Sequence, residues 1–160
     1  MLGTKVLITG EPKGRVINGI VSGTPSPGTI MQIANAVEPV SGRYTWEVFD
    51  QAADGDRPSG PVAVLLEKGE GYDYSTAYED GYDCRVYIPL HGDELNMLVA
   101  ASGTATSDAQ AIGDKYIIED GTGLLIATTG TPECEPFTCM ETLTDVVAAG
   151  TMTHVIFTGF

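Results

Sequence analysis

The fold is decided by a series of short apolar runs, the first of which is Cys84-Arg85-Val86-Tyr87-Ile88-Pro89-Leu90. Three more runs follow, at Leu95-Asn96-Met97-Leu98-Val99-Ala100, Lys115-Tyr116-Ile117-Ile118-Glu119 and Gly123-Leu124-Leu125-Ile126-Ala127-Thr128. Glycines separate these runs at intervals of eight to eleven residues, at Gly81, Gly92, Gly103, Gly113, Gly121 and Gly130. Strand-length runs bounded by turn residues at this spacing are typical of a barrel or sandwich. The sequence therefore predicts an all-β fold.

The strand pattern also occupies the first half of the chain. Further runs lie at Thr29-Ile30-Met31-Gln32-Ile33-Ala34, Tyr44-Thr45-Trp46-Glu47-Val48-Phe49 and Pro61-Val62-Ala63-Val64-Leu65-Leu66-Glu67. Alternation in the second of these predicts that Tyr44, Trp46 and Val48 share the core face. At most one short helix is expected, capped by Ser107 and ended by Gly113. Beyond the glycine spacing, no internal repeat of twenty or more residues is visible.

The composition indicates one globular domain with an acidic surface. The 160 residues are 42% apolar, enough to bury a core without disulfides or a metal. A net charge of −14 repels phosphate, so neither direct nucleic-acid binding nor binding to an anionic membrane is expected. No signal peptide or membrane span is predicted. The charge favours either plain solubility or attraction to a basic partner.

The first 27 residues differ from the rest. They carry two apolar runs, Lys5-Val6-Leu7-Ile8-Thr9 and Arg15-Val16-Ile17-Asn18-Gly19-Ile20-Val21, followed by the proline-rich hinge Gly23-Thr24-Pro25-Ser26-Pro27-Gly28. Residues 1–27 are predicted to be an arm and hinge that precede a domain at 28–160. The alternative is an N-terminal strand of that same domain. If the arm binds another protein, the candidate contacts are Val6, Ile8, Arg15 and Ile17.

A polar insertion at residues 68–80 carries three tyrosines among acids, Tyr72, Tyr74 and Tyr78. Tyrosine suits binding surfaces because it brings a large contact area at a small entropic cost. Aromatic rings beside acids also line sugar sites. The insertion is therefore either a hairpin loop covering the barrel mouth, a protein contact or a sugar contact.

No arrangement of residues predicts a catalytic centre, a cofactor or a metal. Asp54-Gly55-Asp56 lacks the rest of a calcium loop and is expected to be a β-turn. Cys84, Cys134 and Cys139 do not have zinc-finger spacing, and reduced thiols are favoured over a Cys134–Cys139 bridge. Neither His91 nor His154 lies near a serine or cysteine that reads as a nucleophile. An enzyme is not expected.

From Gly28 onwards, the order of elements resembles the lambda-type head decoration family of tailed bacteriophages. The matching elements in the first part are Pro27-Gly28-Thr29-Ile30-Met31, Gly60-Pro61-Val62-Ala63-Val64-Leu65, Tyr78-Glu79-Asp80-Gly81 and Arg85-Val86-Tyr87-Ile88. Those in the second part are Gly92-Asp93-Glu94, Gly113-Asp114-Lys115-Tyr116-Ile117-Ile118, Gly121-Thr122-Gly123, Cys139-Met140-Glu141-Thr142 and His154-Val155-Ile156-Phe157. The insertion at 68–80 makes this chain longer than the smallest members.

The resemblance implies a homotrimeric β-tulip or small barrel with an N-terminal arm. Such a protein is a non-enzymatic decoration or cement protein on the outside of the phage head. Its partner would be the major capsid protein, to which the arm adds a strand, and it would be assembled in the host cytoplasm. The alternative function is a carbohydrate- or receptor-binding β module on a virion or cell surface.

Overall fold

The computed structural model describes Val6 and residues 13–37, 42–69, 75–100, 111–128, 131–142 and 151–160, with side chains left out for residues 35–37. Within these residues the chain forms ten strands and no helix, which confirms the all-β prediction. Most of the expected helix, residues 107–110, lies outside the described residues, and Ile112 and Gly113 form a turn. In the same ranges, no helix has the length and apolar character needed to cross a membrane.

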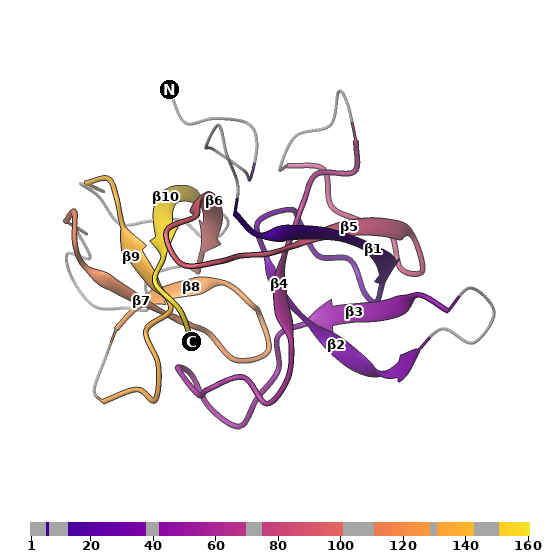
Figure 1. Ribbon diagram of the computed structural model, residues 1–160, viewed down its shortest axis with the longest axis horizontal. Helices are drawn as coiled ribbons and strands as arrows, with labels where there is room; N and C mark the ends of the chain where they lie inside the picture. The colour runs from indigo at the N-terminus through magenta and orange to yellow at the C-terminus, as the bar shows by residue number, and fades with distance from the viewer. Residues whose placement is uncertain are drawn as a thin grey trace.

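The strands form two closed five-stranded barrels that lie side by side (Figure 1). The first barrel contains β1 (Arg15–Val21), β2 (Ile30–Val37), β3 (Tyr44–Val48), β4 (Val62–Leu65) and β5 (Asp83–Ile88). The second contains β6 (Glu94–Val99), β7 (Lys115–Ile118), β8 (Leu125–Ala127), β9 (Phe137–Cys139) and β10 (Thr151–Phe157).

The two barrels are copies of one topology. If the strands of each barrel are numbered from one to five along the chain, both have the neighbour order 1-3-2-4-5. In both, the first and third strands pair in parallel and every other pair is antiparallel. The registers correspond as well: Ile17↔Val86 matches Leu95↔Val155, Val21↔Trp46 matches Val99↔Leu125, and Met31↔Ala63 matches Tyr116↔Phe137. The chain therefore contains a structural repeat that its sequence does not display.

The two lumens are filled by different side chains at corresponding positions. In the first barrel, Trp46 is fully buried, and a Cβ added to Gly19 would lie 2.4 Å from its Cδ1 atom. The registers place Met97 and Leu125 at these positions in the second barrel, and both are fully buried. The first lumen thus pairs a tryptophan with a glycine, which has no side chain. The second lumen pairs a methionine with a leucine, which are both of middle size. Close packing is reached in both because the volumes compensate.

A continuous apolar layer joins the barrels. Val62, Val64 and Tyr87 belong to β4 and β5 but point away from the first lumen, because they alternate with the lumen residues Ala63 and Val86. All three pack in the same buried cluster as the lining of the second barrel. The interface is therefore part of the protein core.

A buried carboxylate reinforces this junction. Asp93, which directly precedes β6, is 2% exposed. Its carboxylate accepts hydrogen bonds from the Tyr87 hydroxyl at 2.6 Å and from the backbone N–H groups of Leu90 at 2.7 Å, Lys13 at 2.8 Å and Gly14 at 3.1 Å. One side chain therefore holds the start of the second barrel against β5 and the segment that enters β1.

The expected core face of β3 is only partly correct. Trp46 is buried in the first lumen, and Val48 packs against it as a half-buried side chain. Tyr44 follows the same alternation but is 44% exposed. It is the first residue of β3, at the end of the strand and away from the middle of the barrel.

Candidate interaction surface

The segment expected to form an arm is built into the first barrel over the residues that the structure describes. β1 pairs with β5 on one edge and with β3 on the other, and Val21 at its end is buried. The arm prediction is therefore corrected for residues 15–21, where the alternative of an N-terminal strand of the same domain holds. The physical reason is that β5 pairs with one edge of β1 over Arg15–Ile20 and β3 meets the other edge at Ile20 and Val21, so β1 is one of the strands that close the barrel.

The four candidate arm residues lie in different environments. Val6 is fully buried: its N–H donates to the Glu67 carboxylate, and its carbonyl accepts from the Asn96 N–H at 2.7 Å. Ile17 is half-buried against the core of the first barrel, and Ile8 lies outside the described residues. Only Arg15 is an exposed side chain.

Arg15 has a neighbour suited to a protein contact. Val16, which follows it on β1, is 47% exposed. Lys13, two residues before Arg15, adds a second positive charge close by, and its Nζ lies 3.5 Å from the His91 carbonyl oxygen. We call Lys13, Arg15 and Val16 the β1 patch. It is an exposed segment at the start of β1 that carries two basic side chains and one apolar side chain on a strongly acidic chain.

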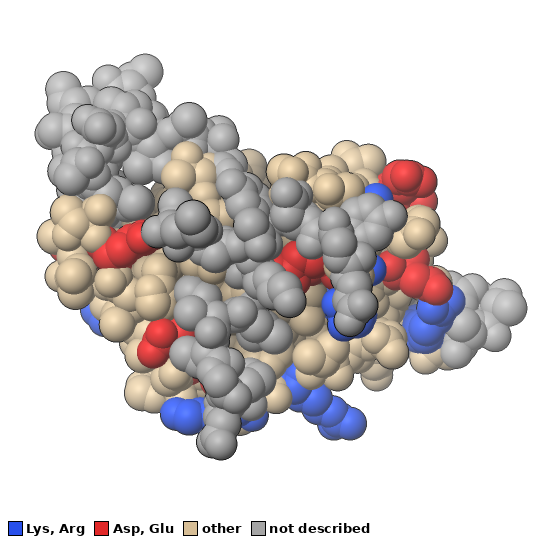
Figure 2. All heavy atoms as spheres, turned by 90° about the horizontal axis from the view of Figure 1, so that it is seen from above, with Lys and Arg blue, Asp and Glu red and all other residues tan. Residues whose placement is uncertain are grey.

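On one face of the molecule, charge is divided into small groups. On the face shown in Figure 2, acidic and basic side chains occur in small separate groups and do not form one broad acidic field. A basic partner would therefore be recognised by local pairs of charges on this face.

The tyrosine insertion is described only at its end. Tyr72 and Tyr74 lie outside the described residues. Tyr78 is 2% exposed, and its hydroxyl donates to the Leu66 carbonyl at 2.9 Å. Burial raises the pKa of Tyr78 to about 12. Tyr78 is therefore a core residue and not the outer-surface contact that was expected of it, because its ring closes the lumen of the first barrel.

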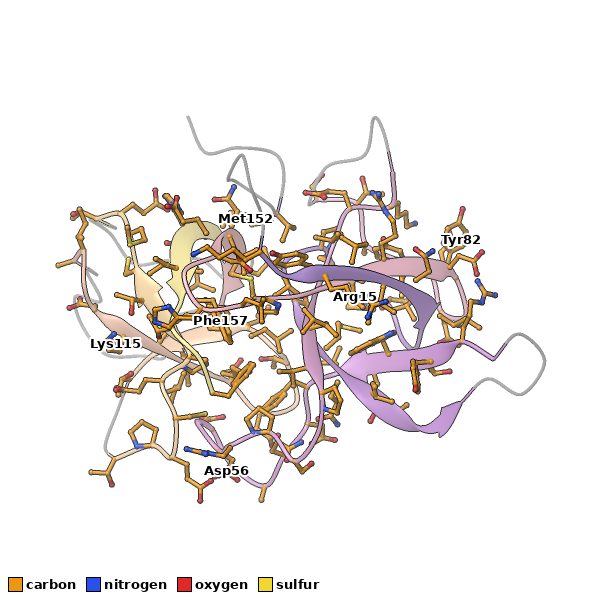
Figure 3. All side chains as sticks on the ribbon, viewed as in Figure 1. Arg15, Asp56, Tyr82, Lys115, Met152 and Phe157 are labelled. Atoms are coloured by element: carbon orange, nitrogen blue, oxygen red, sulfur yellow. The ribbon has the colours of Figure 1, made fainter. Side chains whose placement is uncertain are left out.

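Two other tyrosines, Tyr82 and Tyr44, are exposed at the surface. Tyr82 is 49% exposed and packs edge-on against Tyr78, with ring centroids 6.4 Å apart. The Lys68 ammonium lies 5.2 Å from the centre of the Tyr82 ring, within cation–π range. Figure 3 shows Tyr82 at the end of the first barrel that points away from the second barrel.

Tyr44 lies at the same end, because an ion pair ties the starts of β3 and β5. The Arg43 Nη1 and Asp83 Oδ1 atoms are 2.6 Å apart, and these residues adjoin Tyr44 and Tyr82 respectively. The repeated Gly-Tyr-Asp motif at residues 71–73 and 81–83 was the available sequence signal for Tyr82. Nothing in the sequence singled out Tyr44 as exposed.

The three cysteines and His154 make contacts within the fold. Cys84, Cys134 and Cys139 are buried free thiols, and burial together with the nearby Asp83 raises the pKa of Cys84 to about 11. His154 Nε2 lies 3.0 Å from Glu94 Oε2 on the neighbouring strand. No group of three or more potential metal ligands occurs within the described ranges.

Comparison with known proteins identifies a fold. No protein-family model and no curated protein matches the chain. Among solved structures, the chain is similar to the N base of the head fiber protein gp8.5 of bacteriophage phi29, with a TM-score of 0.53 and 10% sequence identity. The similarity covers 91% of this chain and 94% of that chain. At this identity the two proteins share a fold, and both barrels are included in it.

Proposed function

We propose that this chain is a non-enzymatic structural protein of a phage head, which binds the outer surface of the shell as a decoration or cement protein. One observation carries the proposal. The likeness to the base of a head fiber extends over nearly the whole of both chains, so the entire double-barrel unit is matched and not a single small barrel. The lambda-type resemblance of residues 28–160 supports the same class of protein, and adds the homotrimer and the major capsid protein as the expected partner.

Contact with the shell would run through side chains. Both barrels are closed, so neither has the edge strand of an open sheet, which is the usual place for strand addition. The β1 patch is the best candidate surface among the described residues, since it joins two positive charges to an exposed valine. Charged groups of this kind raise association rates and fix orientation, while the apolar group contributes affinity.

Co-sedimentation with expanded phage heads tests the proposal. The wild-type protein should saturate the heads at a fixed stoichiometry and raise their melting temperature, because it binds only the intact state. The double variant Arg15→Glu, Val16→Glu should bind at least about tenfold more weakly. A matched control is Arg57→Glu, Ile112→Glu, which changes an exposed arginine and an exposed isoleucine outside the β1 patch.

Two negative results are possible, and they have different meanings. If wild-type protein does not sediment with the heads at low or moderate salt, the decoration proposal is wrong. If both double variants bind as the wild type does, the shell contact lies elsewhere, and only the assignment to the β1 patch fails.

A further inference from the structure

A hollow of about 260 Å³ lies on the outside of the first barrel. Its lining comes from β2, from the end of β3 with the residues after it, and from the segment that leads into β4. The lining residues are Gln32, Ile33, Glu47, Asp50, Gln51, Ser59, Gly60 and Pro61. Its volume is slightly below the range of about 300 Å³ and upward that is common for sites of drug-sized ligands. A ligand that fills it would therefore be small.

The polar groups of the hollow are already oriented. Gln51 Nε2 donates to Gln32 Oε1 at 2.7 Å and to the Asp50 carbonyl at 2.8 Å. Gln32 Nε2 in turn donates to Glu47 Oε1 at 3.2 Å. Within the described part of the chain, this leaves Gln51 Oε1, one N–H of Gln32 and the second oxygen of Glu47 for a ligand. The hollow therefore presents one amide N–H donor with acceptor oxygens on either side of it.

The second barrel holds the wall of this hollow in place. The turn between β7 and β8 contacts the residues that follow β3: the Gln51 N–H donates to the Asp120 carboxylate, and the Gly121 N–H donates to the Phe49 carbonyl at 3.1 Å. Asp120 is itself held, because its N–H donates to Asp54 Oδ1 at 2.8 Å. A ligand would therefore bind without first ordering the wall, which lowers the entropic cost of binding.

We propose that this hollow binds a single ring of a neutral sugar. A hydroxyl group donates and accepts at once, so neighbouring hydroxyls match an amide N–H set between carboxylate and amide oxygens. Glu47 and Asp50 exclude anionic ligands, whereas Pro61 supplies an apolar contact for the C–H face of the ring. A site for a metal ion is disfavoured, since the described residues contain no group of three or more potential ligands. The site is separate from the β1 patch and from the exposed tyrosines, so it is independent of shell binding.

The test uses the folded full-length protein labelled with ¹⁵N and the methyl glycosides of glucose, galactose and N-acetylglucosamine. The side-chain amide signals of Gln32 and Gln51 should shift and saturate for at least one glycoside, with a Kd near 1 mM in order of magnitude, about that of a few hydrogen bonds. Calcium chloride and methylammonium chloride serve as cationic probes and should leave these signals in place.

A matched glycine pair locates the binding. A Cβ on Gly60 or Gly69 would meet no atom within 4 Å, and neither glycine has a positive φ, so both accept a methionine. Gly60→Met should fill the hollow and weaken the sugar affinity about tenfold or more, whereas Gly69→Met should leave it unchanged. Glu47→Gln keeps the size of the side chain but removes its charge, and should also weaken binding.

Three results would overturn the proposal. The first is the absence of any shift with all three glycosides. The second is a response to a cationic probe with none to sugar, which would make the hollow a cation site. The third is sugar binding that Gly60→Met and Glu47→Gln both leave unchanged, which would place the sugar elsewhere on the protein.

Discussion

Replacing Asp93 with asparagine should destabilise the protein strongly, because this carboxylate joins the two barrels. In Asp93→Asn an NH₂ group takes the place of one carboxylate oxygen. Oδ2 accepts from Tyr87, Leu90 and Gly14, so up to three donors would then face a donor.

The magnitude follows from these contacts. The Gly14 N–H keeps a partner, since it also donates to the Tyr87 hydroxyl oxygen at 2.6 Å. The Leu90 N–H and the Tyr87 hydroxyl lose theirs. A buried group left without a partner costs about 1–3 kcal/mol, so two of them cost about 2–6 kcal/mol of unfolding free energy. Reversing the amide would move the loss to the Lys13 N–H, which donates to Oδ1, and would not avoid it.

Urea denaturation measures this change as a lower midpoint at an unchanged slope. Asp114→Asn is the control, because Asp114 is exposed and accepts one hydrogen bond, from the Ala111 N–H at 2.8 Å. It should cost less than about 1 kcal/mol. If Asp93→Asn costs no more than this control, the four hydrogen bonds do not hold the junction together.

The same carboxylate predicts a response to pH. Burial disfavours the charged form of Asp93, but its hydrogen bonds from Tyr87, Leu90, Lys13 and Gly14 outweigh burial and hold its pKa below the ordinary value. A group whose pKa is lower in the folded state stabilises that state above its unfolded pKa, about 3.9 for aspartate. This stabilisation is lost as the pH falls through the folded pKa. Wild-type stability should therefore decrease on acidification below about pH 4 more steeply than that of Asp93→Asn.

Three further predictions concern the first barrel. Gly19→Ala should cost about 1–3 kcal/mol, because the new methyl group would clash with the Trp46 ring, and a thermal melt would measure this loss. Tyr78→Phe should cost about 1–3 kcal/mol in the same assay, since the Leu66 carbonyl loses its buried donor. Cys84 should react with a thiol reagent at pH 8 only after denaturant is added, since its pKa of about 11 and its burial keep it protonated and covered.

The all-β fold could be predicted from the sequence because its signals are local. Turn glycines and β-branched runs report on a few neighbouring residues, and those signals place strands correctly on both sides of Gly92. Which strands pair with which depends on contacts between distant residues. The parallel pairing of β1 with β3 and of β6 with β8 closes each barrel, and no short pattern encodes it.

The sequence does not reveal the structural repeat, because different side chains fill the two lumens. A lumen constrains total volume and not the residue at each position. Trp46 with Gly19 and Leu125 with Met97 are two ways of filling the same pair of positions, and Ala63 and Phe137 differ in the same manner. Identical residues recur at a few corresponding positions, such as Val21 with Val99 and Val86 with Val155, but the large differences at these lumen positions hide the repeat.

The candidate surface was less predictable than the fold because exposure depends on which strand edges and faces are covered. The apolar run of β1 is compatible with an arm that adds a strand to a partner, and equally with a strand inside a barrel. The pairing of β1 with β5 over Arg15–Ile20 and with β3 at Ile20 and Val21 decides between them, since it makes β1 one of the strands that close the barrel. Alternation then places Val16 on the outer face of β1, whereas Arg15 is exposed at the first position of the strand. Arg15→Glu and Val16→Glu therefore test the proposed shell contact at the exposed start of β1, whereas deletion of residues 1–24 would remove a barrel strand and unfold the protein.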